Sequence, residues 1–145
     1  MEEKTNDQQL LDKSYENVRM GSYAIDCLIE KIENPKLEEL LRKQNKFYLD
    51  GVTALENLAD KFNHELKDIN FMQKGMSFMA IKMKTLMNND TPKFAEMLIQ
   101  GTTMGITDTT KALSEYPTND AELKAIVERI IQHEEEFVDS LKTFL

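Results

Sequence analysis

The 145-residue chain has one cysteine, three prolines, five glycines and no tryptophan. The lone Cys27 has no second cysteine with which to form an intramolecular disulfide, so a reducing compartment is the simplest expectation. So few glycines and prolines exclude collagen-like and linker-rich classes and leave little material for the turns of an all-β protein. No stretch approaches the ~18 apolar residues of a membrane span, and no apolar export segment opens the chain, so we expect a cytoplasmic protein with no membrane contact.

Positive charge is also scarce. The chain has 18 Lys and Arg against 26 Asp and Glu, which gives a net charge of −8. A surface of this sign repels phosphate backbones and anionic lipids, so nucleic-acid binding is excluded from the expected functions. The length predicts a single domain over residues 1–145, and the 41% hydrophobic content indicates a folded core.

Apolar residues recur at alternating steps of three and four along most of the chain, which is the spacing of helices that pack in a bundle. Two start signals place a capping side chain beside a proline of the first turn, namely Asn34 with Pro35 and Asp90 with Pro92. The predicted helices span residues 7–33, 35–63, 71–88, 92–115 and 120–144.

The connections between these helices predict the architecture. The turn at Asn34 is so short that the first two helices must form an antiparallel hairpin. Asn119 with Glu122 resembles a capping box that opens the last helix, so the last two long helices form a second hairpin. Residues 65–89 separate the hairpins, and their apolar spacing predicts a short Met-rich helix within them. We therefore expect an all-α, four-helix bundle of two helical hairpins with one long crossover, in up-down-down-up order.

Two hairpins joined by a long crossover resemble the ferritin-like fold over residues 10–145. More narrowly, five short strings resemble a family of small bacterial ferritin-like proteins, a resemblance that implies a fold and no activity. These strings are Met20-Gly21, MKTL at 83–86, MLIQG at 97–101, MGI at 104–106 and LKTFL at 141–145.

Ferritin-like metalloproteins hold two metal ions with a Glu from each of two helices and a Glu-x-x-His from each of the other two. On the last helix Glu134 matches this pattern, but the residue three further on is Phe137 rather than His. Tyr48 and Gly51 stand at the equivalent positions of the second helix. The inward residues expected near the middle of the first and third long helices contain no carboxylate; they are Tyr15, Val18, Ser22, Ile99, Thr102 and Ile106. The resemblance thus implies a bundle without the di-iron ligand set and without a cofactor, in which Glu134 is the one metal candidate.

Glu134 lies in the apolar seam of the last helix. A carboxylate placed in a core must be paired, hydrogen-bonded or protonated. Tyr48 and Gln44 are expected at the same level of the bundle, where a hydroxyl or an amide would satisfy it. Three interpretations stay open: a buried polar contact that sets helix register, solvent exposure of a slightly rotated helix, and ligand binding.

Five methionines recur at helical spacing along the connecting segment, which makes them a candidate association surface. The first interpretation is that these side chains pack against the bundle or against a second copy of the chain. A flexible thioether surface also suits the binding of an apolar partner or ligand. Copper(I) binding by thioether sulfur is a third alternative. The methionines are Met72, Met76, Met79, Met83 and Met87.

Gly21, Gly101 and Gly105 interrupt helical patterns, where each glycine costs about 1 kcal/mol relative to alanine. Close approach of the first and third long helices would offset this cost, and a small ligand cavity is the alternative. Asp108 lies in a polar half-helix near Gly105, which is either a solvated face or the wall of a pocket. Gly101, Gly105 and Asp108 therefore form a candidate pocket.

The chain has no Gly-rich phosphate loop, no G-x-S-x-G and no CxxC, so we assign no catalytic residue. The leading hypothesis is a non-enzymatic bundle that acts by self-association as a homodimer, or by binding a protein partner or a small apolar ligand. The alternative is a degenerate ferritin-like metal-binding or redox protein that uses Glu134 with Tyr48 and Gln44.

Overall fold

The computed structural model describes residues 3–67, 86 and 90–145, and these residues form helices and contain no strand. The four long helices are α1 (Asn6–Leu28), α2 (Pro35–Lys61), α5 (Thr91–Glu115) and α6 (Ala121–Lys142), and a 3₁₀ turn, η1 (Ile29–Lys31), follows α1. The predicted all-α class is confirmed. The predicted helix over residues 71–88, with its five methionines, lies outside the described residues apart from Leu86.

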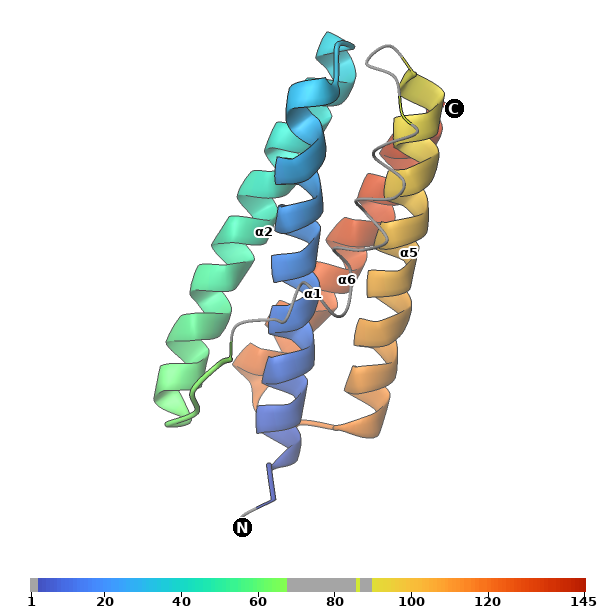
Figure 1. Cartoon of the computed structure of the whole chain (residues 1–145). Coiled ribbons are helices and arrows are strands. Elements are labelled where there is room, and N and C mark those ends of the chain that lie inside the picture. The colour runs from blue at the N-terminus through green and yellow to red at the C-terminus, as the bar shows by residue number, and fades with distance from the viewer. Residues whose placement is uncertain (1–2, 68–85, 87–89) are drawn as a thin grey trace.

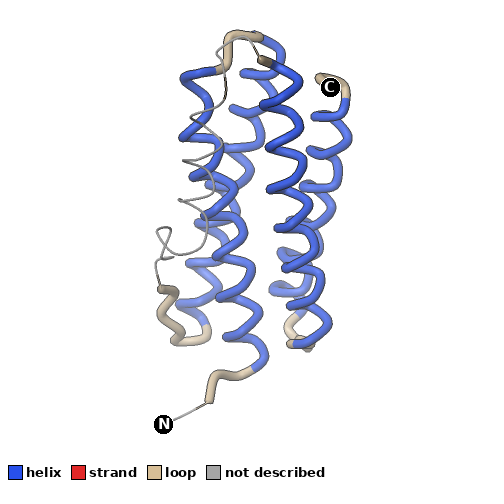
Figure 2. Tube along the Cα trace, turned by 45° about the vertical axis from the view of Figure 1, so that its right-hand side comes forward, coloured by secondary structure: helices blue, strands red, loops and turns tan. Residues whose placement is uncertain are grey.

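The four helices are arranged in up-down-down-up order (Figure 1). α1 packs against α2 and α5, and α6 packs against the same two helices from the opposite corner. Each helix is antiparallel to its two main neighbours, as the two views in Figures 1 and 2 show. α2 ends at the opposite end of the bundle from the start of α5 (Figure 1). Across residues 3–67, 86 and 90–145, no helix combines the length and the apolar character needed to cross a bilayer.

Side-chain caps fix where the helices begin. The carboxamide oxygen of Asn34 accepts two backbone N–H groups at the start of α2, and the carboxylate of Asp90 accepts one at the start of α5. α6 is capped by Asp120, whose carboxylate accepts the N–H of Leu123 at 2.8 Å. The predicted cap Asn119 lies one residue too early, because the neighbouring Asp is an equally good capping residue and takes the position.

The last turn of α2 ends in a left-handed residue. Asn63 has φ of 51°, a conformation that Asn tolerates better than most side chains. The N–H of His64 bonds to the carbonyl of Ala59 at 2.9 Å, and the N–H of Asn63 bonds to that of Asp60 at 3.1 Å. This pair of bonds is the Schellman motif, which satisfies carbonyls that the end of a helix leaves free.

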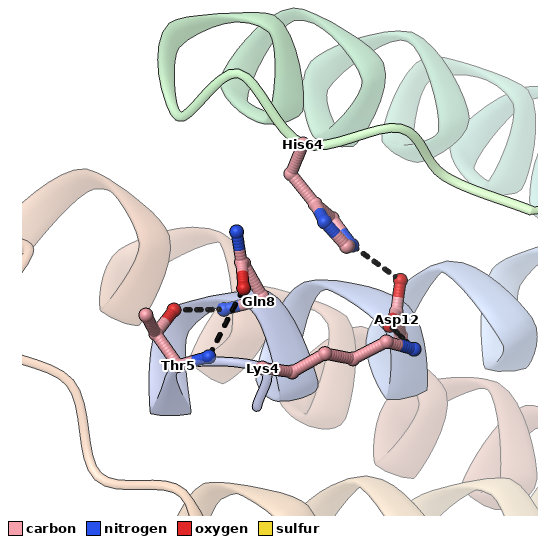
Figure 3. Close-up of polar contacts among 5 residues, drawn as sticks. All are labelled: Lys4, Thr5, Gln8, Asp12 and His64. Carbon is pink, nitrogen blue, oxygen red and sulfur yellow. Dashed lines mark hydrogen bonds and ion pairs between the residues drawn. The ribbon is translucent and has the colours of Figure 1, made fainter. Parts of the chain in front are cut away.

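Polar contacts tie the start of α1 to the end of α2 (Figure 3). The Thr5 hydroxyl accepts the N–H of Gln8 at 3.1 Å, and the Gln8 side chain accepts the N–H of Thr5 at 3.0 Å, so the two form a capping box. One turn later the Asp12 carboxylate accepts from His64 Nε2 and from Lys4 Nζ, each at 2.7 Å (Figure 3). His64 thus links the end of α2 to α1 through its hydrogen bond with Asp12.

The core follows the seams expected from the sequence most closely along α6. Six of the expected seam positions of that helix are buried, and only the terminal Phe144 is not. The buried residues are Leu123, Val127, Ile130, Glu134, Phe137 and Leu141. α5 differs, because its inner face is rotated from the expected one: Thr102 is buried, but Ile99 and Ile106 are only half-buried. The buried residues of α5 are Phe94, Ala95, Met97, Leu98, Thr102, Thr109 and Ala112.

Candidate functional site

Glu134 is the one charged side chain that the described core buries, with 1% of its surface exposed. The apolar neighbours of the α6 seam hold that face of the helix on the core and carry residue 134 inward with it. Asn17 Nδ2 donates a hydrogen bond to Glu134 Oε1 at 2.6 Å, and the Tyr48 hydroxyl donates one to Oε2 at 2.8 Å. The alternative of a solvent-exposed Glu134 is therefore wrong, and the expected contact with Tyr48 is present.

The environment of Glu134 changes its acidity. Burial raises the pKa of Glu134 to about 7, while the hydrogen bonds from Asn17 and Tyr48 act to lower this pKa. Burial, followed by the negative charge of Glu134, raises the pKa of Tyr48 well above its usual value. Tyr48 therefore stays a hydrogen-bond donor at any physiological pH, whereas Glu134 gains or loses its proton close to neutrality.

Gln44 occupies a different place from the expected one. It is buried, with 2% of its surface exposed, one helical turn before Tyr48. Gln44 and Thr102 lower the pKa of the Tyr48 hydroxyl, opposing the effect of burial. No hydrogen bond joins Gln44 to Glu134 in the described part of the chain, where Gln44 Nε2 has no partner. The predicted trio is thus brought together, but Asn17 makes the contact that was expected of Gln44.

Asn17 is the residue that the sequence analysis missed. It lies one position before the seam residue Val18, on a part of α1 that an a/d pattern assigns to the flank. A signal was nevertheless present, because residues four apart share a helical face and Asn17 precedes Gly21 by four. The glycine marks the face of α1 that approaches other parts of the molecule most closely.

Two glycines make room for the buried cluster. A Cβ at Gly21 would collide with the ring of Tyr48. A Cβ at Gly105 would collide with Asn17 Oδ1 and would lie 3.3 Å from Glu134 Oε2. The repeated Met-Gly pairs in α1 and α5 therefore leave the space that the two hydrogen-bond donors of Glu134 occupy.

A cavity of about 640 Å³ lies between α1 and α5 and reaches the buried cluster. Gly101, Gly105 and Asp108, the three residues of the candidate pocket, all line it. A Cβ at Gly101 would meet nothing within 4 Å, so this position faces open space. Tyr48 and Glu134 contribute to the lining from α2 and α6, and they form the polar floor of the cavity.

The lining changes from apolar to charged along the cavity. Because α1 and α5 are antiparallel, the C-terminal half of α1 faces the N-terminal half of α5 (Figure 1). Apolar side chains dominate where these halves meet, and they include Ile25, Leu28, Met97 and Leu98. Charged side chains gather toward the other end, namely Lys13, Glu16, Asp108, Lys111 and Glu115.

The site does not fit a di-metal centre. Both oxygens of Glu134 face N–H or O–H donors rather than a second ligand set. In the part of the chain that the structure describes, no group of three or more His, Cys, Asp or Glu side chains is placed to hold a metal ion. Neither histidine joins the cluster: His64 binds Asp12, and His133 stacks on Phe47 with 3.6 Å between the ring centres.

Comparisons with known proteins yield no relative: no family model, no curated protein and no solved structure matches the chain. The resemblance to ferritin-like proteins therefore rests on the strings quoted from the sequence. The function has to be inferred from the buried cluster and from the cavity beside it.

Proposed function

We propose that this protein binds a small, largely apolar molecule in the cavity between α1 and α5. The observation that carries the proposal is the cavity itself, about 640 Å³ in volume, with apolar walls and a polar floor at Glu134 and Tyr48. Ligand pockets commonly measure about 300–1,000 Å³ and combine apolar walls with a few convergent polar groups. The cavity has this combination.

The glycines of α1 and α5 support this proposal. A glycine inside a helix costs about 1 kcal/mol relative to alanine, so three of them need a compensating role. Gly21 and Gly105 admit the ring of Tyr48 and the amide of Asn17, which orient the buried carboxyl group. Gly101 leaves space in the cavity that a side chain would occupy. All three glycines therefore leave space for the cavity or for the side chains of its floor.

We propose, further, that the bundle has the ferritin-like fold with its metal centre replaced. The up-down-down-up order of the helices supports this assignment (Figure 1). So does the central polar cluster, which takes Asn17 from α1, Tyr48 from α2, Thr102 from α5 and Glu134 from α6. In this proposal a hydrogen-bonded carboxyl group takes the place of the metal ions that metalloproteins of that fold hold in the bundle core. The alternative role as a metal-binding or redox protein has only the burial of Glu134 in its favour.

Self-association stays a prediction. The five methionines proposed as an association surface lie outside the described residues, so the structure gives no contact for a homodimer. The proposed ligand site lies between α1 and α5, whereas the proposed association surface lies in the connecting segment. The two activities are therefore separable by experiment.

The proposal is tested by titrating the ¹⁵N-labelled protein with 1-octanol and recording amide spectra. Glycine amides give well-separated signals, and three of the five glycines, Gly21, Gly101 and Gly105, line the cavity. We expect saturable shifts at these three and a smaller shift at Gly51, which is not part of the lining.

A matched pair of variants locates the binding. Gly101→Phe places a large side chain at a position where a Cβ meets nothing within 4 Å. Gly101→Ala also replaces the helical glycine, but it adds only one carbon atom. We expect Gly101→Phe to abolish the octanol-induced shifts and Gly101→Ala to retain them. Equal binding by the two variants, or shifts that map away from α1 and α5, would contradict the proposal.

A further inference from the structure

The polar floor of the cavity offers hydrogen-bond acceptors, and its two donors nearest to Glu134 are directed at that carboxyl group. Asn17 Nδ2 and the Tyr48 hydroxyl both donate to Glu134. An ionised carboxylate has about four lone-pair sites, so two remain available after these bonds. The amide oxygen of Asn17 faces Gly105 on the cavity lining, and it too only accepts. A ligand group that carries N–H or O–H donors therefore finds acceptors at this floor.

The ionisable groups around the cavity are mainly acidic. Carboxyl groups outnumber amines among the lining side chains by four to two: Glu16, Asp108, Glu115 and Glu134 against Lys13 and Lys111. The whole chain carries the same sign, with a net charge of −8. A carboxylate or phosphate ligand would meet an excess of like charge, whereas a cation is attracted to both the cavity and the protein.

The lining changes from apolar to charged along the cavity. This change indicates that the ligand carries an apolar tail in addition to its cationic group. At the other end, the described lining consists mainly of apolar side chains, including Ile25 and Leu28 of α1 and Met97 and Leu98 of α5. Glu134 lies where the apolar walls give way to the charged end. A molecule that extends along the cavity therefore has its apolar part at one end and its charged part at the carboxyl group.

We propose that the ligand of this cavity is an amphiphilic amine, whose protonated amino group donates hydrogen bonds to Glu134 while its apolar body lies between α1 and α5. The inference rests on the proposed function and narrows it to a chemical class. Binding is non-covalent and uses Glu134 as the acceptor, with Asn17 and Tyr48 as the residues that position its carboxyl group. Asp108 and Glu115 lie at the charged end of the cavity, where Lys13 and Lys111 partly offset their charge.

Three probes of equal chain length separate the charge of the head from the contribution of the tail. The full-length protein is titrated with octylammonium, 1-octanol and octanoate near neutral pH, and the amide shifts of α1 and α5 give each dissociation constant. We expect octylammonium to bind at least about tenfold more tightly than 1-octanol, because its bond to Glu134 is charge-assisted. Octanoate should bind most weakly of the three.

A matched pair on α6 tests the contact itself. Glu134→Gln keeps the shape of the side chain and removes its charge, and Glu135→Gln makes the same change at the next residue, which is exposed and outside the lining. We expect Glu134→Gln to weaken octylammonium binding about tenfold and to leave 1-octanol binding unchanged, while Glu135→Gln alters neither. Asp108 is exposed and lies at the charged end of the cavity, so Asp108→Asn should weaken octylammonium binding by a smaller factor. This variant replaces Glu134→Gln in the test if Glu134→Gln does not fold.

The outcomes separate the two proposals. If 1-octanol binds in the cavity but octylammonium binds no more tightly, or octanoate binds as well as the amine, the ligand class is wrong and the apolar cavity stands. Equal losses in Glu134→Gln and Glu135→Gln would show a general charge effect and overturn the direct contact. If none of the three probes shifts the amides of α1 and α5, the ligand class and the proposed function are both wrong.

Discussion

Replacing Gly21 by alanine is expected to destabilise the protein, although alanine is the better helix former. The added Cβ would collide with the ring of Tyr48. That ring is buried, and its hydroxyl donates a hydrogen bond to Glu134 at 2.8 Å, so a shift away from the new Cβ would disturb this bond. Overpacking lowers the free energy of unfolding by about 1–3 kcal/mol, and loss of the buried hydrogen bond would lower it by about 1–3 kcal/mol more. The higher helix propensity of alanine raises it by about 1 kcal/mol. The net expected loss is roughly 1–5 kcal/mol if the bond is lost and roughly 0–2 kcal/mol if it is kept.

Gly101→Ala is the matched control. The substitution is the same and also falls inside a long helix, but the new Cβ meets nothing within 4 Å. Only the gain in helix propensity remains, so the free energy of unfolding should rise by about 1 kcal/mol. Urea unfolding followed by far-UV circular dichroism measures both variants against the parent protein. If Gly21→Ala is as stable as the parent, or if both variants shift stability in the same direction, the close contact at Tyr48 does not constrain the fold as argued.

Three further predictions concern the buried cluster and the end of α2. Burial raises the pKa of Glu134 from 4.5 to about 7, so the folded state holds this proton more tightly than the unfolded state does. The resulting stability is complete below about pH 4.5 and falls by about 3 kcal/mol as the pH rises to about 7. Glu134→Gln should remove this slope in urea unfolding measured across that range, and equal slopes in the two proteins would contradict the assignment. Tyr48→Phe takes away one donor, so the pKa of Glu134 should rise further and stability at neutral pH should fall by about 1–3 kcal/mol; an unchanged pKa in a carboxyl ¹³C titration would refute this. At Asn63, with φ of 51°, glycine should raise the Tm and alanine should lower it; the reverse order would show that the left-handed end of α2 is unimportant.

The helices follow from signals that are local in the sequence. Asn34 and Pro35 mark the start of α2, and Asp90 and Pro92 mark that of α5, because capping needs only a side chain and the backbone a few residues away. The burial of Glu134 was also foreseeable, since the apolar spacing of α6 carries that position into the seam along with its neighbours. For such features, spacing along one helix is sufficient information.

The partners of Glu134 depend on how four helices are rotated against one another, and no single helix contains that information. Tyr48 was expected from the register of two hairpins, but the choice of Asn17 over Gln44 depends on the rotation of α1. Gly101 and Gly105 give the same signal in the sequence. Only the packing shows that Gly105 adjoins a buried cluster and that Gly101 faces a cavity.

The cavity as a binding site for apolar molecules is the central claim, and intermolecular nuclear Overhauser effects test it most directly. The protein would be labelled at its methyl groups and saturated with 1-octanol. The account predicts contacts from the octanol chain to methyl groups at the apolar end of the cavity, on Leu28, Met97 and Leu98. Contacts confined to Leu49, an exposed leucine on α2 outside the lining, or no contacts at all, would contradict it.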